Sequence, residues 1–433
     1  MIGGCPCRKY LIEAGRFDYV DNLTTESVNE EWEESVIRGR HRQEDEVALG
    51  YLNDPFTGLK AATVPYEGLL QQTLITGATG YGKTTHMVAT LLQIAENGDG
   101  FCYVDAKGDG AVNLLARLPE RRLDDVVFVG ALNSGIVRGI DPFSSVPDNP
   151  EHLEATVRSI VALLREDSSV WGAKMDYAAR LAVRLVLEGH GDIDDLQAVT
   201  RGQTDAIEEL RGGQQDDAEA LLEFVENDRD VFDPVHRRLN RILSRSRMHR
   251  LLTETDPPDF DDAVAEGKII IVAAPGTHQT NQLFCSFATR QWWDAVTQRR
   301  DGDPSEIPLF LAIDEAGSVS EGLSLQDIVR RAQELRVGTF IGVQQLSELD
   351  AEDKSTVLGS CDNRIAFNPQ DTHTANEMTA GDFPATREEL LDVDQFVAWS
   401  RLAAQHGLAV TKVRSFAPID PVRDPAKVDL TSE

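Results

Sequence analysis

The sequence is short of cysteine and has no long hydrophobic run. Its five cysteines, among 433 residues, lie too far apart for a disulfide framework or a paired metal site, which favours a cytoplasmic location. The beginning of the chain lacks the apolar run of a signal peptide, and no window approaches the roughly 18 apolar residues of a membrane span. We therefore expect no transmembrane segment, and we exclude the disulfide-rich secreted class and the membrane-spanning class.

Positive charge is also scarce. Lysine and arginine total 42 against 73 aspartates and glutamates, which leaves a formal net charge of −31, and only nine residues are lysine. Such an excess of carboxylates indicates adaptation to molar salt, where the screening length falls to about 3 Å and self-repulsion costs little. An acidic protein of ordinary salt conditions is the alternative. The net charge disfavours a nucleic-acid partner, but the local charge of a binding surface decides the matter.

The composition divides the chain into four parts. The first 46 residues are polar and acidic with one expected helix, and we treat them as an appendage. Short apolar runs bounded by Gly, Pro and Asp then alternate with helical patterns, which is typical of an α/β fold with a mainly parallel sheet between layers of helices. The expected parts are an appendage at 1–46, an α/β domain at 47–143 and 263–421, an inserted all-helical domain at 144–262, and a tail at 422–433.

The period of the apolar residues predicts the individual elements. Strands are expected at 71–76, 101–105, 126–130, 139–143, 268–275, 308–314, 339–345 and 363–369, with closing edge strands at 395–402 and 408–415. Helices are expected at 85–100, 152–167, 173–189 and 217–228.

The segment GATGYGKT, from Gly77 to Thr84, has the spacing of a phosphate-binding loop between a strand and a helix. Its glycines allow backbone conformations that turn successive N–H groups toward phosphate oxygens. Lys83 is expected to neutralise the β- and γ-phosphates of ATP, and Thr84 to place its hydroxyl on Mg²⁺. A glycine turn with an unrelated lysine is the alternative. The predicted nucleotide contacts are Gly77, Ala78, Thr79, Gly80, Tyr81, Gly82, Lys83, Thr84 and Thr85.

A second apolar run, PLFLAIDEAG, ends in Asp314 and Glu315. As a strand, it would deliver Asp314 to the carboxyl edge of the sheet, where the carboxylate can hold the Mg²⁺ shell. Glu315 could then polarise the attacking water. Together with the glycine loop, the acidic pair predicts hydrolysis of a nucleoside triphosphate. The alternative is a strand followed by the acidic start of a helix.

Three further polar residues are candidates for catalytic roles. Gln344 follows an apolar strand pattern, and an amide there could sense the γ-phosphate, although a solvated loop amide is the alternative. Arg336 and Arg364 are candidates for reaching the nucleotide of a neighbouring subunit, as arginine fingers do. Since arginine is abundant in this chain, two solvated surface arginines are the alternative.

The stretch from His236 to Arg250, HRRLNRILSRSRMHR, holds six arginines and no acid within an otherwise acidic chain. One interpretation is a helical surface that faces nucleic-acid phosphates. The other is a surface whose arginines pair with the protein's own carboxylates. The sequence leaves both open.

The order of these segments resembles that of the HerA/FtsK superfamily of DNA-pumping motors, and most of all the type IV secretion coupling proteins of conjugation. The matching segments, which cover roughly residues 47–421, are GATGYGKTT, YVDAKGD, GIDPF, WGAKMDYAARL, FDDAVAEGKIIIV, LFLAIDEAG, RVGTFIGVQQLSEL and NRIAF. The resemblance implies a RecA-like P-loop domain with a helical insertion. It further implies a homo-hexameric ring with ATP between subunits and DNA, of unknown form, in the channel. Lys83 and Thr84 would be the nucleotide and metal contacts, Asp314 the metal ligand, Glu315 the base and Gln344 the sensor.

Two departures from the pattern stand out. Coupling proteins usually begin with membrane helices, so this chain is expected to be a soluble form or to dock at the membrane through a membrane or relaxase partner. Tyr81 stands where a small residue is commoner, although its side chain can point away from the phosphates. The acidic composition indicates a haloarchaeon or its mobile element as the source.

Two other functions stay open. The first is a HerA-like DNA end-processing helicase or a viral genome-packaging ATPase, which would share the motor chemistry. The second is an ATP-dependent switch or assembly scaffold that moves nothing. Glu315 argues against the second, because a pure switch needs no activated water.

Overall fold

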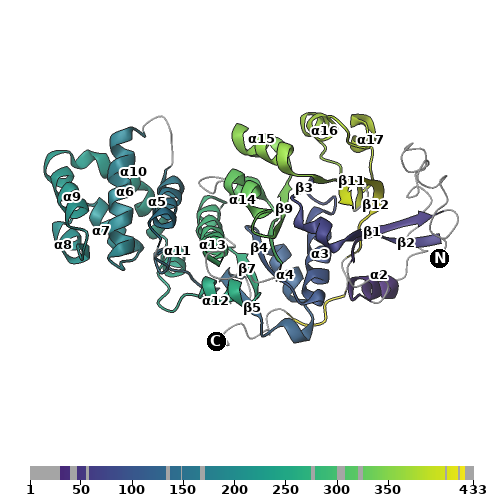
Figure 1. Cartoon of the computed structure of the whole chain (residues 1–433), viewed down its shortest axis with the longest axis horizontal. Coiled ribbons are helices and arrows are strands. Elements are labelled where there is room, and N and C mark those ends of the chain that lie inside the picture. Colours follow the sequence, from purple (N-terminus) through teal and green to yellow (C-terminus); the bar gives the residue numbers. More distant parts are fainter. Residues whose placement is uncertain are drawn as a thin grey trace.

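A computed structural model describes most of the chain outside its two termini. The described residues are 30–39, 46–54, 58–132, 137–147, 149–165, 171–274, 278–299, 308–319, 325–404, 407–417 and 420–424. Figure 1 shows a twisted sheet covered by helices, with a second group of helices set to one side of it. Most of the expected appendage and of the expected tail lies outside the described residues.

Within the described residues, twelve strands form one sheet in the order β2-β1-β12-β11-β10-β3-β9-β8-β4-β7-β5-β6. The seven strands from β10 to β5 in that order run parallel, and the outer strands pair antiparallel. The mainly parallel sheet is thus confirmed. The strands are β1 Glu46–Asp54, β2 Gly58–Pro65, β3 Thr73–Thr76, β4 Gly100–Asp105, β5 Val126–Ala131, β6 Val137–Arg138, β7 Ile269–Ala273, β8 Leu309–Ile313, β9 Val337–Val343, β10 Asn363–Ala366, β11 Val397–Ala404 and β12 Gly407–Arg414.

Alternation along the central strands divides the core into two layers, because successive side chains of a strand point to opposite faces. In β4, Phe101 and Tyr103 join the core layer beneath α3 (Lys83–Asn97) and α4 (Asp109–Leu115). Cys102 and Val104 join the layer beneath α13 (His278–Gln298) on the other face. The sheet is therefore covered by helices on both faces, as the nearly continuous apolar runs of its strands predict.

Two strand predictions need correction. The segment 139–143 is not a strand: β6 ends at Arg138, and the backbone of Ile140 bonds with Leu251 and Glu254 instead of with a sheet neighbour. Asp141 Oδ1 accepts from Phe143 N at 2.9 Å, which closes a turn around Pro142. β11 and β12 form as antiparallel strands but are not the edge, because β1 and β2 extend the sheet beyond them.

The remaining helices of the sheet region surround the strands. α2 (Glu30–Ile37), in the expected appendage, packs on α3, and Arg38 just after it pairs with Glu96 at 2.8 Å. α3 ends where Gly98 takes a left-handed conformation, with φ 98°, that glycine readily adopts. The other helices are α12 Phe260–Ala265, α14 Leu325–Ala332, α15 Ala351–Ser360, α16 Thr372–Met378 and α17 Arg387–Leu391.

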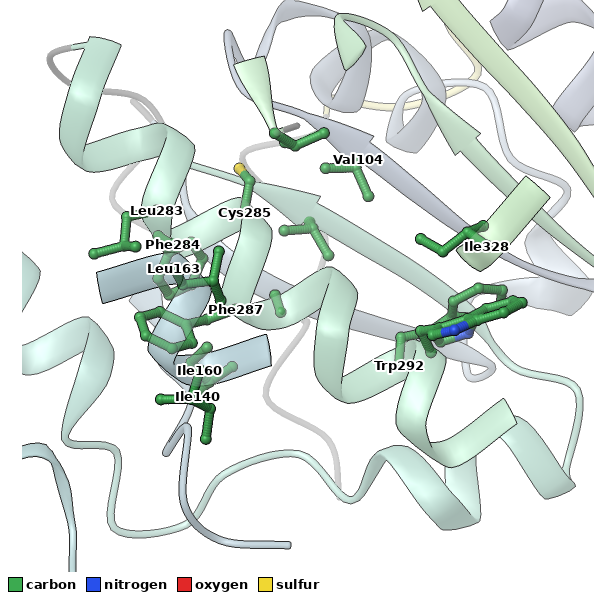
Figure 2. Packing of buried hydrophobic residues seen from close by; sticks show 14 of the residues in the cluster. Val104, Ile140, Ile160, Leu163, Leu283, Phe284, Cys285, Phe287, Trp292 and Ile328 are labelled. Carbon is green, nitrogen blue, oxygen red and sulfur yellow. The ribbon is translucent and has the colours of Figure 1, made fainter. Parts of the chain in front are cut away.

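Among the described residues between β6 and α12, seven α-helices make up the group at the left of Figure 1. They join the sheet region through α13: Figure 2 shows Phe284 and Phe287 beside Ile160 and Leu163 of α5, with Ile140 close by. The helical character of this segment agrees with the expectation, while its limits at 144 and 262 stay a prediction. The helices are α5 Pro150–Leu164, α6 Ala173–Glu188, α7 Ile193–Thr200, α8 Thr204–Leu210, α9 Gln215–Asn227, α10 Asp233–Leu243 and α11 Ser246–Leu252.

No helix among the described residues is both long enough and apolar enough to span a membrane.

Candidate active site

The glycine loop joins the buried strand β3 to the start of α3. Gly80 and Gly82 have φ values of 84° and 110°, in the left-handed region that favours glycine. A Cβ on Gly82 would lie 2.8 Å from Cδ1 of Phe396, so no larger residue fits there. The loop is anchored to the neighbouring strand ends by bonds from Gly77 N to Val343 O and from Ala78 N to Asn368 O, at 3.3 and 2.9 Å.

A cleft of about 240 Å³ opens beside this loop at the carboxyl end of the parallel strands. Of the predicted nucleotide contacts, Gly77 and Tyr81 do not line it; Tyr81 turns its hydroxyl to the Gln370 amide, 2.7 Å away. The other predicted contacts line the cleft together with the acidic pair. The lining residues are Ala78, Thr79, Gly80, Gly82, Lys83, Thr84, Thr85, Asp105, Lys107, Asp109, Gly110, Asp314, Glu315 and Phe396.

Lys83, Thr84 and Asp314 meet in the cleft, although Asp314 lies more than 200 residues from the other two in sequence. The Thr84 hydroxyl donates to Asp314 Oδ2 at 2.7 Å, and Lys83 Nζ lies 3.9 Å from Asp314 Oδ1. Burial raises the pKa of Asp314 to about 6, and the Lys83 ammonium opposes this shift. The expected lysine, hydroxyl and strand-end carboxylate are therefore in one place.

The donor set at this point suits Mg²⁺. Asp314 Oδ1 is buried and lacks a hydrogen-bond donor, so it has a lone pair to offer a cation or its water shell. A hydroxyl and a carboxylate are the hard oxygen ligands that Mg²⁺ prefers, and Mg²⁺ commonly takes its other ligands from water and phosphate. Thr84 and Asp314 would hold the ion.

Glu315 lies at the side of the cleft and accepts hydrogen bonds from two side chains. Lys107 Nζ and Gln344 Nε2 both contact its Oε1. Gln344 in turn accepts from the hydroxyl of Thr79 in the glycine loop, at 3.0 Å. The structure thus brings the predicted base, the predicted sensor and the loop into one chain of hydrogen bonds.

The turn after β4 contributes residues that the sequence analysis left without a role. Asp105 ends β4, beside β8, and its carboxylate accepts from Lys107 N and Ala111 N at 3.0 and 2.9 Å. Burial raises its pKa. The segment YVDAKGD offered a signal for Asp105 in the sequence, because it ends a predicted strand in polar residues. The carboxyl ends of parallel strands lie at one edge of the sheet, where ligands bind.

Tyr103 and Phe396 gave no signal in the sequence. The Tyr103 hydroxyl is fully buried without a hydrogen-bond partner, and burial together with the Asp314 charge raises its pKa well above the usual value. A Cβ on Gly110 would lie 2.0 Å from this hydroxyl, so glycine is required beside it. Phe396 lines the cleft with a positive φ of 63°, and bonds from its N–H to Tyr81 O and from Ser415 N to its carbonyl hold it there.

The two candidate arginine fingers do not line the cleft. Arg336 precedes β9 and so lies at the opposite end of that strand from Gln344, with Glu67 3.7 Å away. Arg364 lies within β10, and its guanidinium donates to Leu358 O at 2.6 Å. Their roles toward a neighbouring subunit stay predictions.

The arginine-rich stretch forms α10 and α11 of the helical group. Arg238 is buried, whereas Arg237, Arg247 and Arg250 are exposed and pair with no acid among the described residues. His249 does pair with Asp194, at 2.8 Å. Part of this surface therefore carries exposed positive charge that the protein's own described carboxylates do not take up.

One known family and several solved structures match this chain. Residues 308–381 match the family described as "TraM recognition site of TraD and TraG", a segment that holds Asp314, Glu315 and Gln344. No curated protein sequence matches the chain.

Solved structures of low sequence identity share the fold. One is the plasmid coupling protein TrwB in complex with the non-hydrolysable GTP analogue GDPNP: TM-score 0.65, 15% identity, 90% of this chain and 94% of that chain covered. A second is TrwB in complex with ADP and Mg²⁺, with a TM-score of 0.62 and 16% identity over 84% of this chain and 89% of that chain. The chain has the RecA-like P-loop NTPase fold. VirB4 of Thermoanaerobacter pseudethanolicus has a similar fold, with a TM-score of 0.58 and 14% identity over 87% of this chain and 97% of that chain. The predicted resemblance to coupling proteins is confirmed at the level of the fold.

Proposed function

We propose that this chain is an Mg²⁺-dependent ATPase that moves DNA in conjugative transfer or type IV secretion, as one subunit of a ring, most simply a homo-hexamer. The observation that carries the proposal is the meeting of Lys83, Thr84 and Asp314 beside the glycine loop, with Glu315 at the side of the same cleft. The fold shared with TrwB, and the family match at 308–381, support the assignment to this kind of motor.

The residues divide the work of hydrolysis. Loop N–H groups and Lys83 bind the β- and γ-phosphates, while Thr84 and Asp314 hold the metal. Bound Mg²⁺ would neutralise charge on the phosphate oxygens. Glu315 takes a proton from the attacking water, and Gln344 links that carboxylate to the loop through Thr79.

Phe396 supplies a contact for the nucleoside. Its aromatic ring reaches the cleft next to Gly82, and its left-handed backbone is a conformation that a bulky residue keeps only when its surroundings enforce it. Strained residues of this kind gather at ligand-binding sites. We assign the ring to packing against the base or ribose.

Arg237, Arg247 and Arg250 supply DNA phosphate contacts. Their exposure and their lack of carboxylate partners among the described residues favour the nucleic-acid interpretation of this stretch over internal pairing. The match at 308–381 further supports a protein partner for the face of α15 and α16, which lie together at the top of Figure 1.

An ATPase assay in molar KCl, with and without single- and double-stranded DNA, tests the function. We expect Mg²⁺-dependent hydrolysis that at least one DNA form stimulates several-fold. If the protein binds nucleotide but hydrolyses it under none of these conditions, the result would point to a switch or scaffold. Hydrolysis that no DNA form changes, by protein shown to be folded, would contradict the motor.

A further inference from the structure

Lys107 lies in the turn between β4 and α4, and its ammonium group contacts the carboxylate of Glu315. Its side chain is 52% exposed, whereas that of Glu315 is 13% exposed. Lys107 also lines the cleft that holds Lys83 and the glycine loop. A flexible, half-exposed lysine can therefore reach either the carboxylate or an anionic ligand in the same cleft.

The contact engages one of the two oxygens that general-base chemistry could use. Oε1 of Glu315 accepts from Lys107 and from Gln344 at once, so a water that approached this oxygen would meet two donors already in place. A carboxylate takes a proton from water only through a lone pair that the water can reach. The turn thus places a competing cation directly on the predicted base.

We propose that Lys107 contacts the γ-phosphate of ATP, and that this phosphate and the carboxylate of Glu315 compete for its ammonium group. When Lys107 turns to the γ-phosphate, it stabilises the charge of the transferred group, and Oε1 becomes accessible to the attacking water. ADP lacks the γ-phosphate and leaves Lys107 on Glu315. This inference rests on the proposed ATPase function and adds to it a residue that couples base availability to the presence of the third phosphate.

A double-mutant cycle tests the competition. Binding of Mg²⁺ complexes of ADP and of the non-hydrolysable analogue ADPNP is measured by calorimetry for the wild type, Lys107→Met, Glu315→Gln and the double variant. We expect Lys107→Met to weaken ADPNP about 10-fold, the lower end of the range for one charge-assisted hydrogen bond because the lysine is half exposed, and to leave ADP within about two-fold. Lys107→Arg should restore most of the ADPNP affinity.

The cycle separates competition from simple charge repulsion. Glu315→Gln should tighten ADPNP in either background, because a carboxylate repels a phosphate, but the tightening should be several-fold larger when Lys107 is present. An equal gain in both backgrounds, or an equal loss of ADP and ADPNP in Lys107→Met, would overturn the assignment. Lys174→Met, an exposed lysine paired with Asp228 on the helical group, is the matched control and should change neither affinity.

Failure of this inference can be told apart from failure of the function. If the wild type binds ADPNP with Mg²⁺ and hydrolyses ATP while the cycle shows no coupling, only the role proposed for Lys107 is wrong. If the wild type binds no Mg²⁺–nucleotide, the proposed function falls as well. Retained ADP binding shows in each variant that the site is folded.

Discussion

The parallel strands have a buried arginine at their amino ends and buried acidic groups at their carboxyl ends, and the two are bonded differently. Arg122, in the turn before β5, donates to Asp125 Oδ2 at 2.6 Å and to the carbonyls of Ala95, Asp99 and Gly267 at 3.1 to 3.2 Å. These bonds tie α3 and the starts of three strands together. The amino end therefore satisfies its buried charge within the protein.

The carboxyl end leaves buried polar atoms unsatisfied. Asp314 Oδ1 and the Tyr103 hydroxyl have no hydrogen-bond partner, and burial raises the pKa of Asp314 to about 6. A buried polar group without a partner costs roughly 1–3 kcal/mol. Gln72 Nε2, just before β3, also lacks a partner, so an unsatisfied atom alone does not mark a site. Asp314 Oδ1 differs because it lies beside Lys83 and the glycine loop, where a free carboxylate oxygen suits a metal and phosphates, and this supports the proposed function at the carboxyl end.

The largest effect is expected from Glu315→Gln, at the carboxyl end of the strands. The amide cannot accept the water's proton, so turnover should fall about 10²- to 10⁴-fold while ATP stays bound. Hydrolysis and bound nucleotide are measured on the same sample. Unchanged turnover would remove Glu315 from the role of base.

The reverse change at the amino end should affect stability and leave nucleotide binding intact. Arg122→Met removes four hydrogen bonds, to three carbonyls and to Asp125, and leaves a buried methionine in place of a bonded guanidinium, so the free energy of unfolding should fall by about 3 kcal/mol. Denaturant unfolding at fixed KCl measures it. Arg121→Met is the matched control, because its exposed pair with Glu96 should contribute less than about 1 kcal/mol. Equal losses in both variants would contradict the role given to Arg122.

The glycine loop and the acidic pair were predictable because their chemistry is local. Gly80, Gly82 and Lys83 act through backbone shape and one helix terminus, and an apolar run ending in Asp314 identifies the edge of a buried strand. Residues of this kind carry their structural context with them in the sequence.

Other parts of the site depend on contacts that no local pattern contains. Lys107 and Glu315 are 208 positions apart and meet only because β4 and β8 pair in parallel. Phe396 reaches the loop through the bond from its N–H to Tyr81 O, across more than 300 residues. The false strand at 139–143 has a similar cause: its apolar residues indicated burial, but their hydrogen-bond partners belong to the helical group.

Phe396→Ala refines the picture at the carboxyl end by separating nucleoside from phosphate binding. Loss of the ring should weaken ADP about 10-fold and leave pyrophosphate unchanged, since packing on an aromatic ring contributes of the order of 1 kcal/mol or slightly more. Phe396→Tyr keeps the ring and should bind like the wild type. A matching loss of pyrophosphate affinity would mean that Phe396 only supports the loop.

Replacement of Arg237, Arg247 and Arg250 by serine separates DNA binding by the helical group from hydrolysis at the sheet. Each phosphate contact contributes about 0.9 to the slope of log affinity against log salt, so the slope for double-stranded DNA should become smaller by roughly 3. Hydrolysis without DNA should not change. The matched control replaces Arg180, Arg184 and Arg211, which pair with acids of their own domain. If both triple variants flatten the slope equally, the assigned surface is wrong.

A pH-dependent effect on stability is expected from Asp141, in the segment that joins β6 to the helical group. Burial raises its pKa from 3.8 to about 6, so the folded protein holds this proton more tightly than the unfolded chain, and stability falls as pH rises from about 4 to about 6. Asp141→Asn keeps an acceptor for Phe143 N and removes the charge. Thermal unfolding should show the variant more stable than the wild type at pH 7 and equal to it near pH 4, whereas parallel pH curves would contradict the assignment.

The most direct test of the central claim is the affinity for ATP with and without Mg²⁺, in the wild type and in Asp314→Asn. If Lys83, Thr84 and Asp314 hold a metal-bound triphosphate, Mg²⁺ should tighten ATP binding by the wild type at least about 10-fold, since it adds oxygen–metal bonds at this point. Most of that gain should vanish in Asp314→Asn, while binding without metal persists. Equal responses to Mg²⁺ in the two proteins would show that the ion, and with it the proposed chemistry, lies elsewhere.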